Sequence, residues 1–193
     1  MSSTYLSSSL TFYSDKITTT MEEFGDEELP VMMDWEHPLM SASAAYVTQN
    51  GGDILEIGFG MGISAGYMHS HSINSHTIVE NHPEIIPKAV EWANGKSNVT
   101  IVSQSWYDVK DSLGTYDGVF YDTYGDDNAK QFSSSLSTWT KSGTKVTWWH
   151  DRSNNRSNYH GIQNVTYKSI NVSPPSNTYF TGSTIYYLPM KEF

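Results

Sequence analysis

Apolar runs and amphipathic stretches alternate along the middle of the chain, between residues 38 and 149. Short apolar runs bounded by glycine, asparagine or acid predict buried strands. Apolar residues at helical spacing, with proline near the start or glycine after the end, predict helices between them. Such alternation predicts an α/β fold with a mostly parallel, doubly wound sheet and helices on both faces. The expected strands are 53–57, 76–80, 98–102, 116–122 and 145–149, and the expected helices are 38–47, 63–71, 83–93 and 126–139.

The pattern changes after residue 150. Residues 165–172 and 179–188 are rich in β-branched and aromatic side chains, and Pro174-Pro175 lies between them without room for a helix. This arrangement predicts an antiparallel β-hairpin at one edge of the sheet. Residues 1–193 are therefore expected to form a single domain, with a core at 31–150 and a C-terminal hairpin within 151–193.

The first thirty residues have a different character. Serine and threonine dominate at the start, and acidic residues follow at 22–28. One interpretation is a solvated, partly disordered leader. The other is a lid that folds over a bound ligand, anchored by Phe12, Tyr13 or Phe24.

The composition excludes several classes of function. The chain has 193 residues, a formal net charge of −10 and no cysteine. Without cysteine, disulfides, zinc fingers and thiol nucleophiles are excluded. The acidic balance argues against nucleic-acid binding, and no apolar run is long enough to cross a membrane. The N-terminus lacks a basic and apolar signal, so a cytoplasmic location is expected. We expect no metal site and interpret His69, His71 and His76 as surface histidines.

A glycine-rich loop carries the first chemical signal. The segment Glu56-x-Gly58-x-Gly60-x-Gly62 joins a predicted strand to a predicted helix, where free backbone N–H groups can hold a ligand. Ile63 stands where a dinucleotide-binding loop needs its third glycine, and the Walker lysine is absent. This form of the loop is typical of enzymes that bind S-adenosylmethionine. Residues 31–150 are therefore predicted to be the cofactor-binding core.

Two further residues fit this interpretation. Glu80 ends the second predicted strand, where an acid can accept hydrogen bonds from ribose hydroxyls. Trp106 follows the third strand and either stacks on the adenine or packs in the core.

Two further acidic residues indicate what kind of substrate the site binds. Asp122 ends the fourth predicted strand, and Glu36 precedes the first predicted helix. Ligands of doubly wound sheets bind outside the carboxyl ends of the strands, which places Asp122 near the reactive part of the cofactor. Paired carboxylates suit a guanidinium, because they accept paired hydrogen bonds from its planar fork. A carboxylate can also accept the proton that such a nucleophile must lose.

Several blocks of the sequence resemble the guanidinoacetate N-methyltransferase family. Residues 30–40 resemble its PVM-x-x-WE-x-P-x-M segment, and 54–61 resemble its VLEVGFGM loop. Residues 78–81, 105–109 and 116–124 are similar to its ribose strand, its LWEDV block and its FDGILYDTY block. The resemblance implies a Rossmann-like class I methyltransferase fold and an S-adenosylmethionine-dependent N-methyltransferase in creatine biosynthesis.

The resemblance also implies residue roles. Glu36 and Asp122 would grip the guanidino group, with Asp122 as proton acceptor. The implied cofactor-binding residues are Met40, Glu56, Gly58, Phe59, Gly60, Met61, Gly62, Ile63, Ser64, Glu80, Asn81, Trp106 and Tyr107. The implied substrate-binding residues are Met32, Glu36, Asp122, Thr123 and His150.

The chain departs from the family pattern in places. Tyr107 replaces an acid, His37 replaces a threonine, and the region beyond Trp149 is shorter. The expected partner is a small guanidino compound, most simply guanidinoacetate, whose carboxylate Arg152 or a backbone N–H would bind. Alternatives are an arginine side chain or a small amine as acceptor, or a cofactor-binding protein without turnover. The sequence does not indicate the oligomeric state.

Overall fold

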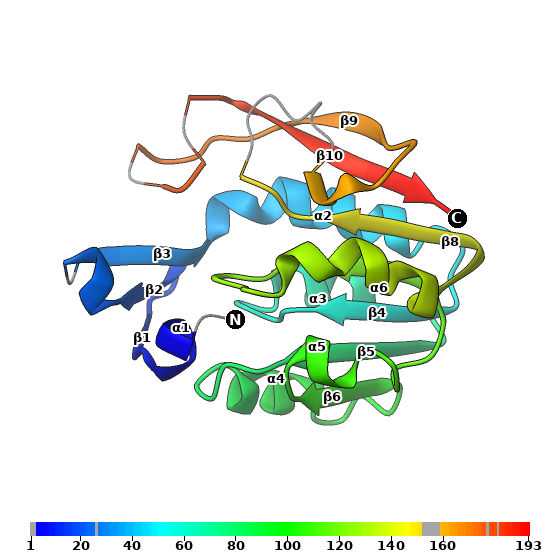
Figure 1. The fold of residues 1–193 in the computed structure, drawn as a ribbon, viewed down its shortest axis with the longest axis horizontal. Helices are drawn as coiled ribbons and strands as arrows, with labels where there is room; N and C mark the ends of the chain where they lie inside the picture. The colour runs from blue at the N-terminus through cyan, green and yellow to red at the C-terminus, as the bar shows by residue number, and fades with distance from the viewer. Residues whose placement is uncertain (1–2, 26, 152–158, 177, 181) are drawn as a thin grey trace.

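The computed structural model describes residues 3–25, 27–151, 159–176, 178–180 and 182–193. A seven-stranded sheet has the strand order β6-β5-β4-β7-β8-β10-β9 (Figure 1). The pairs from β6 to β8 are parallel, and β10 is antiparallel to both β8 and β9. The α/β fold and its terminal antiparallel hairpin are thereby confirmed. The strands are β4 (Asp53–Ile57), β5 (Ser75–Glu80), β6 (Val99–Ser103), β7 (Tyr116–Tyr121), β8 (Thr140–Trp148), β9 (Thr166–Asn171) and β10 (Ile185–Glu192).

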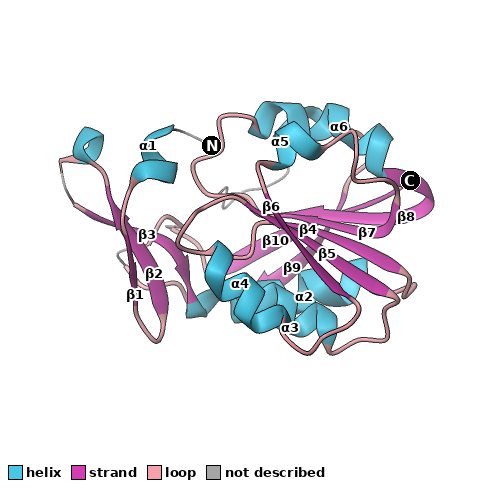
Figure 2. Cartoon of the chain, turned by 90° about the horizontal axis from the view of Figure 1, so that it is seen from below, coloured by secondary structure: helices cyan, strands magenta, loops and turns pink. Residues whose placement is uncertain are grey.

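Helices cover both faces of this sheet (Figure 2). One face carries α2 (His37–Val47), α3 (Ile63–His69) and α4 (Ile86–Ala93), and the other carries α5 (Trp106–Val109) and α6 (Phe132–Trp139). Short 3₁₀ turns are present at Glu22–Phe24, Asp34–Glu36, Ala129–Gln131 and Tyr159–Gly161. Within the described ranges, no helix has the length and apolar character that a membrane span requires.

The N-terminal segment forms structure that the sequence did not indicate. Helix α1 (Ser3–Ser7) is followed by strands β1 (Leu10–Phe12), β2 (Lys16–Thr20) and β3 (Glu28–Met33). The strands make a separate three-stranded antiparallel sheet beside the main one (Figures 1 and 2). The expectation of a partly disordered leader is therefore wrong for β1 to β3.

The proposed anchors of this segment differ in burial. Tyr13 and Phe24 are about half exposed, whereas Phe12 is half-buried and packs against a core cluster that includes Tyr5, which is only 2% exposed. The Tyr5 ring packs on the rings of His82 and Tyr124, with centroid distances of 4.7 and 4.9 Å. Tyr5 thus fixes the segment to the loops that follow β5 and β7.

The observed bounds of the helices and strands differ most from the predicted ones around α6. This helix begins at Phe132 rather than at residue 126. The carboxylate of Asp126 accepts hydrogen bonds from the Tyr121 hydroxyl at 2.5 Å and from Nε1 of Trp106 at 2.6 Å, and so it joins the β7 loop to α5. The helix after β5 also begins late, at Ile86, and β8 begins early, at Thr140.

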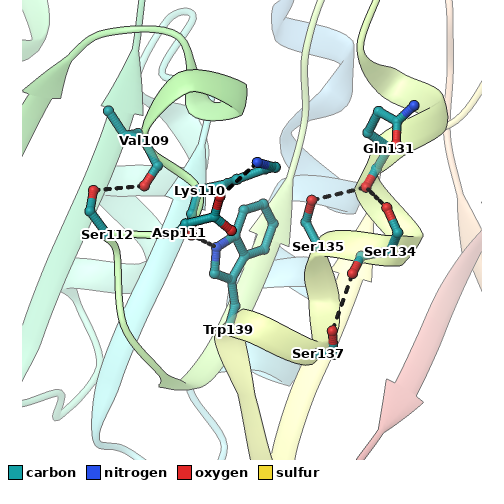
Figure 3. Close-up of polar contacts among 9 residues, drawn as sticks. All are labelled: Val109, Lys110, Asp111, Ser112, Gln131, Ser134, Ser135, Ser137 and Trp139. Carbon is teal, nitrogen blue, oxygen red and sulfur yellow. Dashed lines mark hydrogen bonds and ion pairs between the residues drawn. The ribbon is translucent and has the colours of Figure 1, made fainter.

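A cluster of large aromatic side chains holds α5 and α6 on the sheet. Trp106, Phe132, Trp139 and Trp148 are all buried in it. Nε1 of Trp139 donates a hydrogen bond of 2.8 Å to the carbonyl oxygen of Lys110, directly after α5 (Figure 3). This bond satisfies the polar atom of a buried ring and fixes the distance between the two helices.

Candidate active site

A cavity lies at the carboxyl ends of four adjacent parallel strands, β5, β4, β7 and β8. It has a volume of about 250 Å³. In the strand order of the sheet, Glu80 at the end of β5 is followed by Gly58 after β4, Asp122 after β7 and Trp149 after β8. Its lining comprises Tyr5, Val31, Met32, Glu36, Gly58, Phe59, Gly60, Ser64, Glu80, Ile85, Asp122, Thr123, Tyr124, Gly125, Trp149, Asp151 and Tyr179.

Gly58 brings the glycine loop against the neighbouring strand. It has a φ of +92°, and a Cβ at this position would lie 1.8 Å from the carbonyl oxygen of Asp122. The Asp122 N–H donates a hydrogen bond of 2.9 Å to the carbonyl oxygen of Ile57. The lack of a side chain at Gly58 therefore lets Asp122 lie directly beside the loop.

We expect Gly58→Ala to lower the melting temperature far more than Gly95→Ala does. Gly95 also has a positive φ, of +80°, but open space surrounds its missing Cβ. The control thus measures only the cost of the left-handed backbone, about 1–2 kcal/mol. Thermal unfolding of both variants separates the clash from this cost, and equal melting temperatures would contradict the close contact.

Glu80 organises the loop through backbone hydrogen bonds. One carboxylate oxygen accepts from the Phe59 N–H at 2.9 Å, and the other accepts from the N–H groups of Asn81 and His82 at 2.8 Å each. Glu80 is 4% exposed and lines the cavity. Because an ionised carboxylate has about four acceptor positions, these three donors leave capacity for a ligand hydroxyl.

We expect Glu80→Ala to weaken S-adenosylmethionine binding by at least about tenfold, because a charge-assisted hydrogen bond and the support of the loop are lost together. Calorimetric titration with the cofactor measures this change. Glu91→Ala, on the exposed side of α4, is the matched control and should bind normally. Unchanged affinity in Glu80→Ala would contradict the assigned role.

Glu56 lies beneath the loop rather than in the cavity. It is fully buried, and its carboxylate oxygen lies 2.9 Å from Nε2 of His76, which is also fully buried. The Ser64 hydroxyl donates a hydrogen bond to the other carboxylate oxygen. Glu56 therefore joins β4, β5 and the start of α3. The expectation that His76 lies on the surface is wrong.

Glu36 is held inside the site by several donors. It ends the turn Asp34–Glu36 and is 2% exposed. One carboxylate oxygen accepts hydrogen bonds from the Met33 N–H at 3.0 Å and from the Tyr179 hydroxyl. Burial raises the pKa of Glu36 to about 7, although these hydrogen bonds and the Trp149 indole act in the opposite direction.

Asp122 lines the same cavity, and its pKa is shifted in the same direction. Burial raises its pKa well above the usual value, and the charges of Glu36, Glu56 and Glu80 raise it further. A cation that enters between Glu36 and Asp122 would favour their ionised forms. The cavity therefore suits a positively charged ligand.

Comparisons with known proteins show which family the chain belongs to. The family model described as guanidinoacetate N-methyltransferase matches residues 11–145. The chain belongs to this family. The resemblance seen in the sequence blocks is thus confirmed, and membership of this methyltransferase family implies S-adenosylmethionine as the cofactor.

The names of curated relatives contain arginine, rather than guanidinoacetate, as the methyl acceptor. Protein arginine N-methyltransferase 2 of Aspergillus fumigatus is 35% identical over 135 residues, which cover 66% of this chain and 30% of the relative. The protein of the same name from Saccharomyces cerevisiae is 31% identical over 133 residues, with coverages of 63% and 31%. The match therefore spans less than a third of the length of either relative.

Solved structures confirm the fold. Spermidine synthase from Thermotoga maritima aligns with a TM-score of 0.64 at 9% identity and covers 95% of this chain and 72% of that one. The putative methyltransferase yhhF from Escherichia coli aligns with a TM-score of 0.61 at 14% identity, with coverages of 87% and 93%. The Rossmann-like methyltransferase fold is therefore established.

The structure brings many of the family-implied residues to the cavity. Met32 lies against the glycine loop, where its Sδ accepts a hydrogen bond of 3.2 Å from the Met61 N–H. The implied residues that line the cavity are Met32, Glu36, Gly58, Phe59, Gly60, Ser64, Glu80, Asp122 and Thr123. Those outside its lining are Met40, Glu56, Met61, Gly62, Ile63, Asn81, Trp106, Tyr107 and His150.

Three of the outlying residues belong to the core. Met40 is fully buried in α2. Trp106 is 2% exposed and packs against Tyr121 and Trp139, so the core alternative describes its position. His150 stacks on Tyr186, and its Nε2 lies 3.0 Å from the carbonyl oxygen of Tyr187. The expected carboxylate ligand Arg152 lies outside the described residues.

Other lining residues were missed by the sequence reasoning. They share a position at strand ends or in the N- and C-terminal segments, and they are Tyr5, Val31, Ile85, Tyr124, Gly125, Trp149, Asp151 and Tyr179. Trp149 and Asp151 belong to the segment 148–152, which was expected to contribute substrate contacts without a role for either residue, and they follow β8 at the edge where Asp122 follows β7. Tyr179 carries no sequence signal of this kind.

Proposed function

We propose that this chain is an S-adenosylmethionine-dependent N-methyltransferase that acts on a guanidino group. The observation that carries the proposal is the pair of carboxylates, Glu36 and Asp122, on one cavity next to the glycine loop. Burial opposes ionisation of both groups, so a bound cation is the natural counterpart of the pair. A guanidinium supplies this charge together with a planar set of donors.

The residues at the ends of β4 and β5 fit the cofactor. Gly58 and Gly60 let the loop lie directly against Asp122 and Met32, because a Cβ would lie 1.8 Å from the Asp122 carbonyl oxygen or 2.5 Å from the Met32 Sδ. Glu80, which lines the cavity, can still accept a hydroxyl. When bound, S-adenosylmethionine supplies an electrophilic methyl group on a positively charged sulfur. Tyr5, Val31 and Met32 complete the cavity wall and support the interpretation of the N-terminal segment as a lid.

The acceptor side of the cavity would position and deprotonate the nucleophile. Glu36, fixed by Met33 and Tyr179, would orient the guanidino plane. Asp122 would accept the proton that the nitrogen loses as its bond to carbon forms, which avoids a dicationic product. Burial raises the pKa of Asp122, and a bound guanidinium would favour its ionised form, which is the form that accepts the proton.

Two acceptors have specific support. The description of the family supports guanidinoacetate, which would give creatine. The name of the relatives supports an arginine residue of a protein. A methyl-transfer assay with labelled cofactor against guanidinoacetate, arginine peptides and simple amines tests the proposal. Cofactor binding without transfer to any guanidino compound would overturn it and would favour a binding protein without turnover.

A further inference from the structure

The hydroxyl of Tyr179 joins two distant parts of the chain at the cavity. It donates a hydrogen bond to Oε1 of Glu36, the same oxygen that accepts from the Met33 N–H at 3.0 Å. Burial and the charge of Glu36 raise the pKa of the Tyr179 hydroxyl, so it keeps its proton and stays a donor. Both bonds end on Oε1, and neither occupies Oε2. Because an ionised carboxylate has about four acceptor positions, a guanidinium can bind Glu36 while Tyr179 remains in place.

Packing holds the Tyr179 hydroxyl at this position. The Tyr179 ring lies against Trp35, the residue before Glu36 in its turn, with a centroid distance of 6.1 Å. The next residue, Phe180, is fully buried and stacks on the same indole at 5.7 Å. Trp149 meets the Tyr179 ring edge to face at 5.3 Å, and both rings line the cavity. The C-terminal segment therefore holds the turn that carries Glu36 as well as its carboxylate.

We infer that Tyr179 is a positioning residue of the methyl-acceptor site, which acts through Glu36 by holding one carboxylate oxygen and leaving the other to the guanidino group. This inference rests on the proposed function and adds a residue to its site. The family match ends at residue 145, so it includes Glu36 and not Tyr179. A residue inside the match is thus positioned by one outside it.

The same hydrogen bond affects the charge of Glu36. Burial raises the pKa of Glu36 to about 7, and the bond from Tyr179 is the largest of the effects that lower it. Loss of the bond would therefore raise this pKa further and leave more of the carboxyl group protonated at neutral pH.

Other titratable groups lie near Glu36. Asp34 and His37 flank it in the chain, and both are exposed. The charge of Glu36 raises the pKa of Asp122, so these two acids titrate as a pair. The further titratable side chains that line the cavity are Tyr5, Glu80, Tyr124 and Asp151.

Tyr179→Phe tests the role of the hydroxyl, because the ring contacts remain. The probe is the guanidino compound that the wild type methylates, guanidinoacetate or an arginine peptide. We expect its kcat/KM to fall by about tenfold at pH 7, as for the loss of one hydrogen bond to a charged group. Most of this loss should be an increase in KM, because Asp122 still accepts the proton. Cofactor affinity should stay unchanged, and Tyr187→Phe, on β10 and outside the cavity lining, is the matched control.

The pH dependence of kcat/KM separates this role from packing alone. In Tyr179→Phe the acid limb should move to higher pH by about one unit, because the ionised form of Glu36 loses a donor. Replacement of Tyr179 by 3-fluorotyrosine, a stronger donor of nearly the same size, should move the limb to lower pH. In a Glu36→Gln background, Tyr179→Phe should not move it, because the group through which Tyr179 acts no longer titrates.

The outcomes separate this inference from the proposed function. Wild-type kcat/KM and an unmoved acid limb in Tyr179→Phe would overturn the inference and leave the proposed function intact. An equal shift in the Glu36→Gln background would also overturn it, because Tyr179 would then act through another group. If Tyr179→Phe does not fold, the 3-fluorotyrosine protein decides, and an unmoved limb there counts against the inference. A wild-type protein that binds S-adenosylmethionine and methylates no guanidino compound would overturn the proposed function, and the inference with it.

Discussion

Replacement of Asp122 by asparagine is expected to lower the rate of methyl transfer by about 10²- to 10⁴-fold, the usual contribution of a positioned proton acceptor. The amide keeps the size of the side chain but cannot accept the proton of a guanidinium. Cofactor affinity should stay close to that of the wild type, because the loop contacts of Glu80 do not involve the Asp122 side chain. Single-turnover assays and cofactor titration measure the two quantities separately.

The stability of this variant offers an independent check. Burial and neighbouring carboxylates oppose the ionised form of Asp122. Removal of this carboxyl group in Asp122→Asn should therefore not lower the melting temperature. Asp111→Asn, at an exposed position, is the control for the substitution itself. A fully active Asp122→Asn variant would exclude Asp122 as the proton acceptor.

Replacement of Glu36 by glutamine is expected to have opposite effects on activity and stability. The amide oxygen can still accept from Met33 and Tyr179, but the charge that faces a guanidinium is lost. We expect kcat/KM for the acceptor to fall by about 10²-fold or more, as for other buried charge pairs that lose one partner. At pH 8 we expect the variant to have a higher melting temperature than the wild type.

The sign of the stability effect follows from the pKa of Glu36. Its folded-state pKa of about 7 lies above the value of 4.5 for the free side chain, so the folded state binds the proton more tightly. The stabilising contribution is complete below pH 4.5 and is lost as the pH rises to 7, by about 3 kcal/mol. The advantage of Glu36→Gln should therefore be absent at pH 4.5 and complete above pH 7. A lower melting temperature of the variant at pH 8 would contradict this assignment.

The central sheet and the glycine loop could be predicted because their signals are local. Apolar runs such as 53–57 encode buried strands directly, and the glycines that follow them encode a close backbone approach. Strand β2 shows where this approach fails. Its residues Thr18 and Thr19 are buried, and their hydroxyls bond Glu28 and Ser8 at 2.7 and 2.6 Å. Hydropathy cannot reveal a strand whose polar side chains are satisfied by distant partners.

The residues that follow β8 show a second limit of prediction from the sequence. His150 was expected to bind the acceptor, but the neighbouring residues Trp149 and Asp151 line the cavity instead. Residues 149 and 151 both line the cavity, whereas His150 between them stacks on Tyr186 and does not line it. The sequence located the segment correctly, but only the structure shows which alternate residues face the ligand. Tyr179 reaches Glu36 across 143 positions of the chain, a distance that no local pattern encodes.

The end of the family match at residue 145 has an evolutionary consequence. Gly58, Glu80 and Asp122, which we propose to hold the cofactor and the reacting atoms, lie inside the match, whereas the lining residues Trp149, Asp151 and Tyr179 lie beyond it. Mutations in the C-terminal segment could therefore exchange one methyl acceptor for another while the cofactor loop stays intact. Such a division lets a lineage diversify its substrates without first losing its chemistry.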